Sequence, residues 1–73
     1  METENTKIKI GKQIKARREF LDISQNDLSM HSGVAQTRLS QIELGKTNFT
    51  IDTIEIIADV LGMEVRLVEK GNS

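Results

Sequence analysis

The sequence predicts an all-α domain of four helices, followed by a short C-terminal strand. Apolar residues recur at helical spacing in successive stretches, and glycines or capping hydroxyls stand between several of those stretches. After Gly62 the pattern changes to an alternation of apolar and polar residues, which is typical of a strand. We expect residues 1–73 to form one domain, with disordered ends at about residues 1–5 and 71–73.

The first helix is expected from about Ile8 to Leu21. Residues at helical spacing form its inward stripe: Ile10, Ile14, Arg18 and Leu21. The alternation of Lys7–Ile10 leaves a short extended lead-in as the alternative. Arg17 borders the stripe, where its aliphatic stem can cover the edge of the core, and Phe20 is expected to help fill that space.

The second and third helices are separated by a short turn that contains Gly33. Ser24 can cap the second helix, and Gly33 can take the positive φ that ends it. The third helix is expected over Ala35–Leu44, with Gly45 as its stop. Two short helices with a tight glycine-containing turn predict a helix-turn-helix, a motif that places its second helix in the major groove of DNA.

The predicted third helix has two chemically different faces. One side carries apolar residues that would pack on the preceding helix: Ala35, Leu39 and Ile42. The other side carries hydrogen-bonding side chains suited to base edges and phosphates: Gln36, Thr37, Arg38, Ser40 and Gln41. On an arbitrary helix a polar face is more often merely solvated, but the adjoining turn favours a DNA-contacting face here.

This region resembles the Cro/CI-type (XRE) helix-turn-helix regulators, which share the four-helix lambda-repressor-like fold. The likeness extends over roughly Ile10 to Gly62, and its matching residues are Ser24-Gln25, Leu28, Gly33-Val34, Leu39-Ser40, Glu43 and Gly45-Lys46. It implies base contacts by Gln36, Thr37, Ser40 and Gln41, and phosphate contacts by Gln25, Lys46 and Asn48. We expect Ser24 and Arg38 to hold phosphates as well. Ser29 departs from the family's usual alanine, and we expect its hydroxyl to bond the carbonyl one turn back.

Arg18 and Glu43 are expected to form a structural salt bridge. Arg18 lies on the inward side of the first helix and Glu43 borders the inward side of the third. A buried charge needs a partner, and a guanidinium matches a carboxylate in bidentate geometry. The family resemblance also implies an Arg–Glu pair at these positions. The alternative is two unrelated surface charges.

The fourth helix is expected over Ile51–Leu61, between the capping residue Thr50 and Gly62, with Phe49 filling the core below it. Its apolar arc is wider than one core contact requires, so we expect a second buried face against another copy of the chain. The alternative is a helix that lies deep in its own domain.

The predicted strand, Met63–Glu69, could pair with Lys7–Ile10 or with the same strand of a second copy. A C-terminal strand after such a core is similar to the HipB-like antitoxin-repressors. The expected homodimer interface contains Ile56, Val60, Val65 and Leu67.

The composition argues against enzymatic and membrane functions. One histidine, His31, and no cysteine do not supply the ligands of a metal site, and no catalytic constellation or cofactor motif is present. We therefore expect no metal, no cofactor and no enzyme. Without a signal peptide or an apolar run of about 20 residues, a cytoplasmic protein that contacts no membrane is expected. The net charge of −1 argues mildly against nucleic acid, but six of the ten cationic residues lie between Lys7 and Arg18.

The expected function is therefore sequence-specific binding to double-stranded DNA by a homodimer, most simply as a repressor on a palindromic operator. One alternative is an antitoxin-type module that neutralises a toxin or kinase-like partner, with DNA binding secondary. The acidic face of the fourth helix, formed by Asp52, Glu55 and Asp59, favours that alternative. Another is a structural dimer with a degenerate recognition surface.

Overall fold

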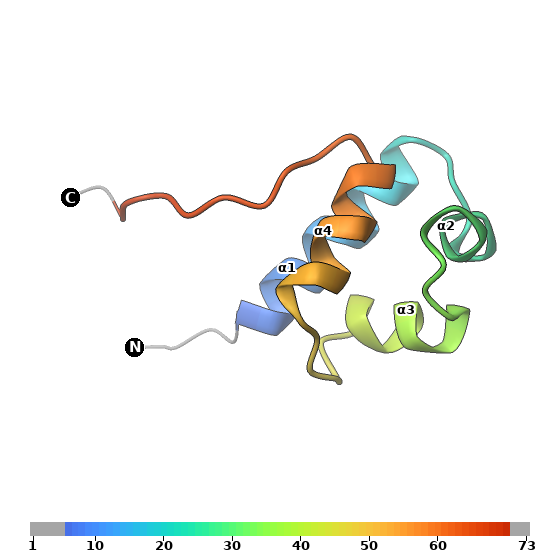
Figure 1. Cartoon of the computed structure of the whole chain (residues 1–73), viewed down its shortest axis with the longest axis horizontal. Helices are drawn as coiled ribbons and strands as arrows, with labels where there is room; N and C mark the ends of the chain where they lie inside the picture. Colours follow the sequence, from blue (N-terminus) through green and yellow to red (C-terminus); the bar gives the residue numbers. More distant parts are fainter. Residues whose placement is uncertain (1–5, 71–73) are drawn as a thin grey trace.

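The computed structural model describes residues 6–70, which contain α1 (Thr6–Phe20), α2 (Gln25–Ser32), α3 (Gln36–Glu43) and α4 (Ile51–Val60). Figure 1 shows α2 and α3 at one end of the molecule, while the segment after α4 extends toward the opposite end. The four-helix prediction is confirmed. Residues 1–5 and 71–73, which we expected to be disordered, lie outside the described residues. Within residues 6–70, no helix combines the length and apolarity needed to cross a membrane.

Helix α1 begins at Thr6 and includes Lys7–Ile10, so the alternative of an extended lead-in is wrong. Gly11 is buried in the middle of this helix. A Cβ at that position would lie 2.7 Å from the Glu43 carbonyl oxygen and closer still to that of Ile42. Only glycine therefore allows α1 to approach the last turn of α3 this closely.

The turn between α2 and α3 follows its predicted chemistry. Ser24 Oγ accepts a hydrogen bond of 3.0 Å from the Asp27 amide, which satisfies one of the free N–H groups of the first turn of α2. Gly33 has a φ of 78°, and its amide donates to the Ser29 carbonyl oxygen at 2.8 Å. This left-handed cap ends α2 and redirects the chain into α3.

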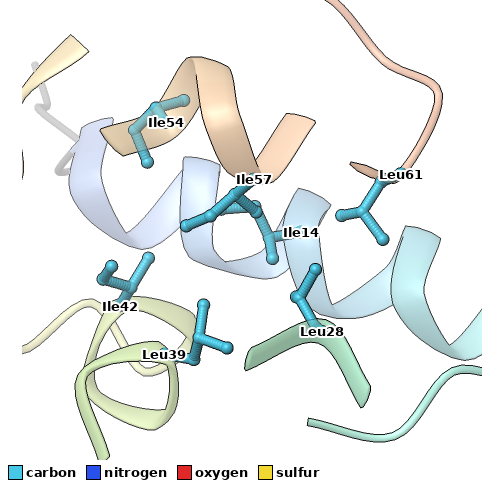
Figure 2. Close-up of a cluster of buried hydrophobic side chains, with 7 residues drawn as sticks. All are labelled: Ile14, Leu28, Leu39, Ile42, Ile54, Ile57 and Leu61. Atoms are coloured by element: carbon cyan, nitrogen blue, oxygen red, sulfur yellow. The ribbon is translucent and has the colours of Figure 1, made fainter. Parts of the chain in front are cut away.

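One apolar cluster holds the helices together (Figure 2). Its buried members come from every helix and from the residue that ends α4: Ile14, Leu28, Leu39, Ile42, Ile54, Ile57 and Leu61. Each such side chain contributes about 1.5–3 kcal/mol when it is removed from water. Phe49 packs against the cluster as expected, whereas Ala35, expected on the inward side, is exposed. Because Leu39 and Ile42 anchor one side of α3, the opposite side faces solvent.

Arg17 joins α1 to the end of α4. Its Nε donates to the Leu61 carbonyl oxygen at 2.9 Å, which satisfies a backbone acceptor at a helix terminus. Its guanidinium carbon lies 5.3 Å from the centre of the Phe20 ring. Phe20 is 76% exposed, so the prediction that it fills the core edge is wrong.

The predicted C-terminal strand is absent: residues 63–70 have no regular secondary structure. A strand requires a neighbouring strand with which its backbone N–H and C=O groups form hydrogen bonds. The proposed neighbour within the chain, Lys7–Ile10, instead makes its hydrogen bonds within α1. The feature on which the likeness to HipB-like proteins depended is thus missing from the described residues.

Candidate nucleic-acid interface

The outward face of α3 is polar and accessible. Gln36, Thr37, Arg38 and Gln41 are exposed, and Ser40 is half-buried. This arrangement follows from the burial of Leu39 and Ile42 on the opposite side of the same helix. Ala35 at the N-cap has no side-chain oxygen, and no side chain caps α3. The backbone N–H groups of the first turn of α3 therefore remain available to donate hydrogen bonds to an anion.

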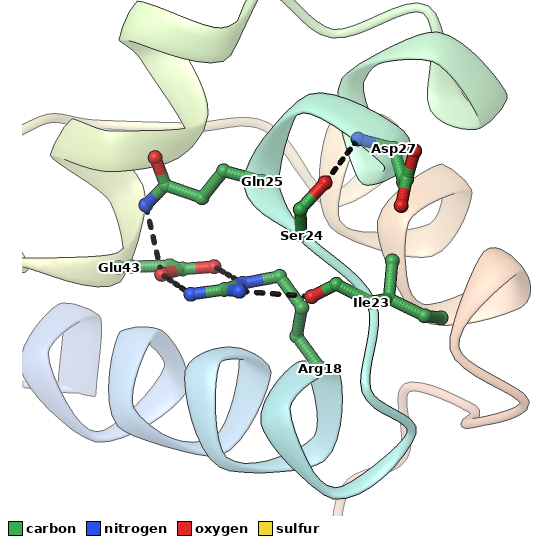
Figure 3. A network of polar contacts seen from close by, with 6 residues as sticks. All are labelled: Arg18, Ile23, Ser24, Gln25, Asp27 and Glu43. Atoms are coloured by element: carbon green, nitrogen blue, oxygen red, sulfur yellow. Dashed lines mark hydrogen bonds and ion pairs between the residues drawn. The ribbon is translucent and has the colours of Figure 1, made fainter.

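A buried ion pair fixes α3 against α1 (Figure 3). Arg18 Nε lies 2.7 Å from Glu43 Oε2, and Arg18 Nη2 lies 3.0 Å from Glu43 Oε1, so the guanidinium and carboxylate meet in bidentate fashion. Arg18 Nη1 also donates to the Ile23 carbonyl oxygen at 2.9 Å, in the link between α1 and α2. The Glu43 side chain is only 2% exposed. The hydrogen bond to Glu43 raises the pKa of Arg18 above its ordinary value despite the opposing effect of burial.

Gln25 extends this network to the start of α2. Its Nε2 donates to Glu43 Oε1 at 3.1 Å. A carboxylate bound to an arginine can only accept hydrogen bonds, so the amide nitrogen of Gln25 must face it, and the amide oxygen points away from Glu43 (Figure 3). The second amide proton of Gln25 and its backbone N–H are left as donors. The sequence predicted a phosphate contact for Gln25 but not this bond to the buried ion pair.

Further predicted phosphate ligands lie in or beside the loop between α3 and α4. Arg38 Nη2 donates to the Asn48 carbonyl oxygen at 3.2 Å, and Lys46 is exposed in the same loop. Lys7 Nζ donates to the Asn48 side-chain oxygen at 2.9 Å. Sequence reasoning placed Lys7 only in a general basic run, because nothing in the spacing links two residues that lie 41 positions apart. The structure thus adds a lysine of α1 to this polar cluster.

Ser24, which caps α2, and Ser29, which lies within it, differ in their hydrogen bonding. The exposed Ser24 uses an oxygen lone pair for its capping bond, which leaves its hydroxyl proton available to an acceptor. Ser29 is half-buried, and among residues 6–70 its hydroxyl makes no hydrogen bond, so the expected bond to the preceding turn is not formed.

Within residues 6–70, no group of three His, Asp or Glu side chains could hold a metal ion.

The residues expected at a homodimer interface lie on α4 and on the segment that follows it. Ile56, Val65 and Leu67 are exposed large apolar side chains. Val60 is half-buried and packs against the core of its own chain. The segment after α4, which carries Val65 and Leu67, extends away from α2 in Figure 1.

Comparison with known proteins places this geometry in context. A family model described as helix-turn-helix matches residues 14–68. An uncharacterized HTH-type transcriptional regulator of Sinorhizobium fredii, y4dL, is 36% identical over 61 residues, which make up 84% of this chain but 31% of that protein. The crystal structure of the restriction-modification controller protein C.AhdI from Aeromonas hydrophila superposes with a TM-score of 0.78 at 24% identity, covering 84% of this chain and 92% of that one. The chain thus spans less than a third of the length of y4dL, and the likeness to C.AhdI shows a shared fold.

Proposed function

The chain belongs to the helix-turn-helix family, as its resemblance to the XRE-type regulators predicted, and on that premise we propose that it is a DNA-binding transcriptional regulator. The observation that carries the proposal is the outward polar face of α3, whose opposite side is anchored by Leu39 and Ile42. A helix held in this way can enter the major groove without losing its packing. Regulation would then depend on equilibrium binding and not on catalysis.

The proposed base contacts come from this face of α3. Its two glutamines, Gln36 and Gln41, can each form a pair of hydrogen bonds with the N6 and N7 atoms of adenine. Thr37 and Ser40 can bond to base edges or pack against a thymine methyl group. The exposure of Gln36, Thr37 and Gln41 is necessary for this function, since buried side chains could not reach a duplex.

The proposed phosphate contacts flank the same face. They come from the start of α2, from α3 and from the loop that follows it: Ser24, Gln25, Arg38, Lys46 and Asn48. Lys7 adds positive charge beside Asn48. Charge effects at ordinary ionic strength extend only about 10 Å, so these nearby cations matter more for binding than the overall net charge of −1.

We further propose a homodimer that represses transcription by covering a palindromic operator. A two-fold dimer would present two copies of α3 to half-sites about 34 Å apart, one turn of DNA. Exposed Ile56, Val65 and Leu67, together with half-buried Val60, support an interface on the α4 side of the molecule. Large apolar side chains left in solvent commonly mark a surface that a partner covers.

The test begins with selection of bound duplexes from a random pool at two salt concentrations. The affinities of two variants, each changed at an exposed position, are then measured on the selected operator and on a random duplex to separate base contacts from phosphate contacts. Gln41→Ala should cost about 1–3 kcal/mol on the operator and relax specificity at one half-site position, with little effect on the random duplex. Lys46→Ala should weaken both duplexes equally and lower the slope of log K against log salt by about one. Equal losses on both duplexes for both variants would contradict the assigned roles, and selection of no duplex would contradict the function.

A further inference from the structure

An acidic groove lies between α4 and the residues that follow it. The groove has a volume of about 640 Å³ and is lined by four carboxylates, Asp52, Glu55, Asp59 and Glu64, and by the apolar Ile56, Ala58, Met63 and Val65. Within residues 6–70, the three carboxylates of α4 make no ion pair, and Glu64 makes only a solvent-exposed contact of 3.6 Å with Arg66. Such an exposed pair contributes little, so the groove retains its negative charge and its apolar lining.

The charges of the groove restrict what can cover it. If two α4 helices packed face to face, the carboxylates of one copy would approach those of the other, and like charges brought together in an interface are unfavourable. An occupant that combines cationic and apolar side chains would meet both parts of the lining. A short extended segment is the simplest occupant of this kind.

Residues 66–70 of the chain have that composition. This segment, Arg66-Leu-Val-Glu-Lys70, carries two cations and one anion, a net charge of +1, and its apolar members, Leu67 and Val68, are exposed. It runs outward from the end of α4 in Figure 1. Because the groove is lined in part by residues 63–65, the segment would have to reverse direction immediately to enter the groove of its own chain. A second copy of the chain has no such restriction.

We infer that residues 66–70 of a second copy occupy this groove. Leu67 of one copy packs on Ile56 and Val65 of the other, while Arg66 and Lys70 lie beside the carboxylates of α4. Two-fold symmetry repeats the exchange, so that each copy both donates and receives a segment. The inference rests on the proposed homodimer and specifies its contacts.

Disulfide trapping tests the inference directly, because the chain has no cysteine of its own. A Leu67→Cys chain mixed with an Ile56→Cys chain should form a mixed disulfide on mild oxidation, since the docked segment brings the two Cα atoms within about 7 Å. The matched control mixes Leu67→Cys with Met30→Cys, whose cysteine would stand at an exposed position on α2, a helix that contributes no residue to the lining of the groove. A mixed disulfide that forms no faster with Ile56→Cys than with Met30→Cys overturns the inference.

Charge reversal gives an independent test by sedimentation equilibrium. Arg66→Glu should weaken dimerisation by about tenfold, and adding Glu55→Arg should restore at least part of that loss. Failure of the second change to restore dimerisation, or a chain that remains monomeric throughout, overturns the inference. A dimer that binds its operator but forms no disulfide contradicts only the segment exchange. A chain that forms the disulfide but binds no duplex contradicts the proposed DNA-binding function instead.

Discussion

Replacing Arg18 with methionine should destabilise the fold more than any surface substitution, because it leaves the Glu43 carboxylate buried without its counter-ion. The structure gives Arg18 two hydrogen bonds to Glu43 and one to the Ile23 carbonyl oxygen. After the substitution, the carboxylate would retain its single bond from Gln25. Methionine preserves much of the aliphatic stem, so the decrease in the free energy of unfolding reports mainly on the charge of Arg18 and its hydrogen bonds.

The expected magnitude follows from the burial of this pair. Breaking a buried ion pair by removing one partner costs about 3–5 kcal/mol, and the 2% exposure of the Glu43 side chain places this pair in that class. A chain of 73 residues has a total stability of about 4–11 kcal/mol at the usual 0.05–0.15 kcal/mol per residue. Arg18→Met should therefore remove a large fraction of the stability, and the variant is expected to be partly or fully unfolded near room temperature.

The measurement is urea unfolding followed by far-ultraviolet circular dichroism, because the chain has no tryptophan or tyrosine for fluorescence. With a slope of about 1 kcal/mol per molar urea, the midpoint should fall by about 3–5 M or the transition should be lost. The control is the double variant Arg18→Met/Glu43→Leu, which removes both charges and should recover most of the stability. An Arg18→Met midpoint within about 0.5 M of the original would falsify the assignment of this pair as a principal link between α1 and α3.

Three further substitutions test other parts of the structure. Gly11→Ala should destabilise the fold by at least about 2 kcal/mol in the same urea assay, because the alanine Cβ would overlap backbone carbonyl oxygens of α3. This loss is expected although alanine is the better helix former. An unchanged midpoint would contradict the close approach of α1 and α3. Ser24→Ala should cost about 0.5–2 kcal/mol through loss of the cap on α2, whereas Ser24→Asp should retain most of the stability, and equal losses would exclude capping as the cause. Gln25→Glu should cost about 1–3 kcal/mol at neutral pH because it places a second carboxylate against Glu43. That repulsion raises the folded-state pKa of the new carboxylate above its unfolded value, so the loss should shrink as pH falls through the folded-state pKa, and a loss independent of pH would contradict it.

The sequence by itself determined the local architecture of this protein. Ser24, Gly33 and Thr50 mark helix ends through interactions within a few residues of the chain, and the structure has the corresponding caps. The periodicity of α3 predicted which side would be buried, and Leu39 and Ile42 are buried there. The Arg18–Glu43 contact was also expected, since a charge on an inward helix stripe requires a partner and the family resemblance supplied one.

Only the tertiary structure decided which distant residues meet. Gly11 proved to be a contact point between helices, Gln25 proved to share Glu43 with Arg18, and Lys7 reached Asn48 across 41 positions of sequence. The strand prediction after Gly62 failed for the same reason, because periodicity shows which side chains alternate but does not provide a neighbour for the backbone. Helix ends depend on nearby residues, whereas these contacts depend on how whole helices pack against one another.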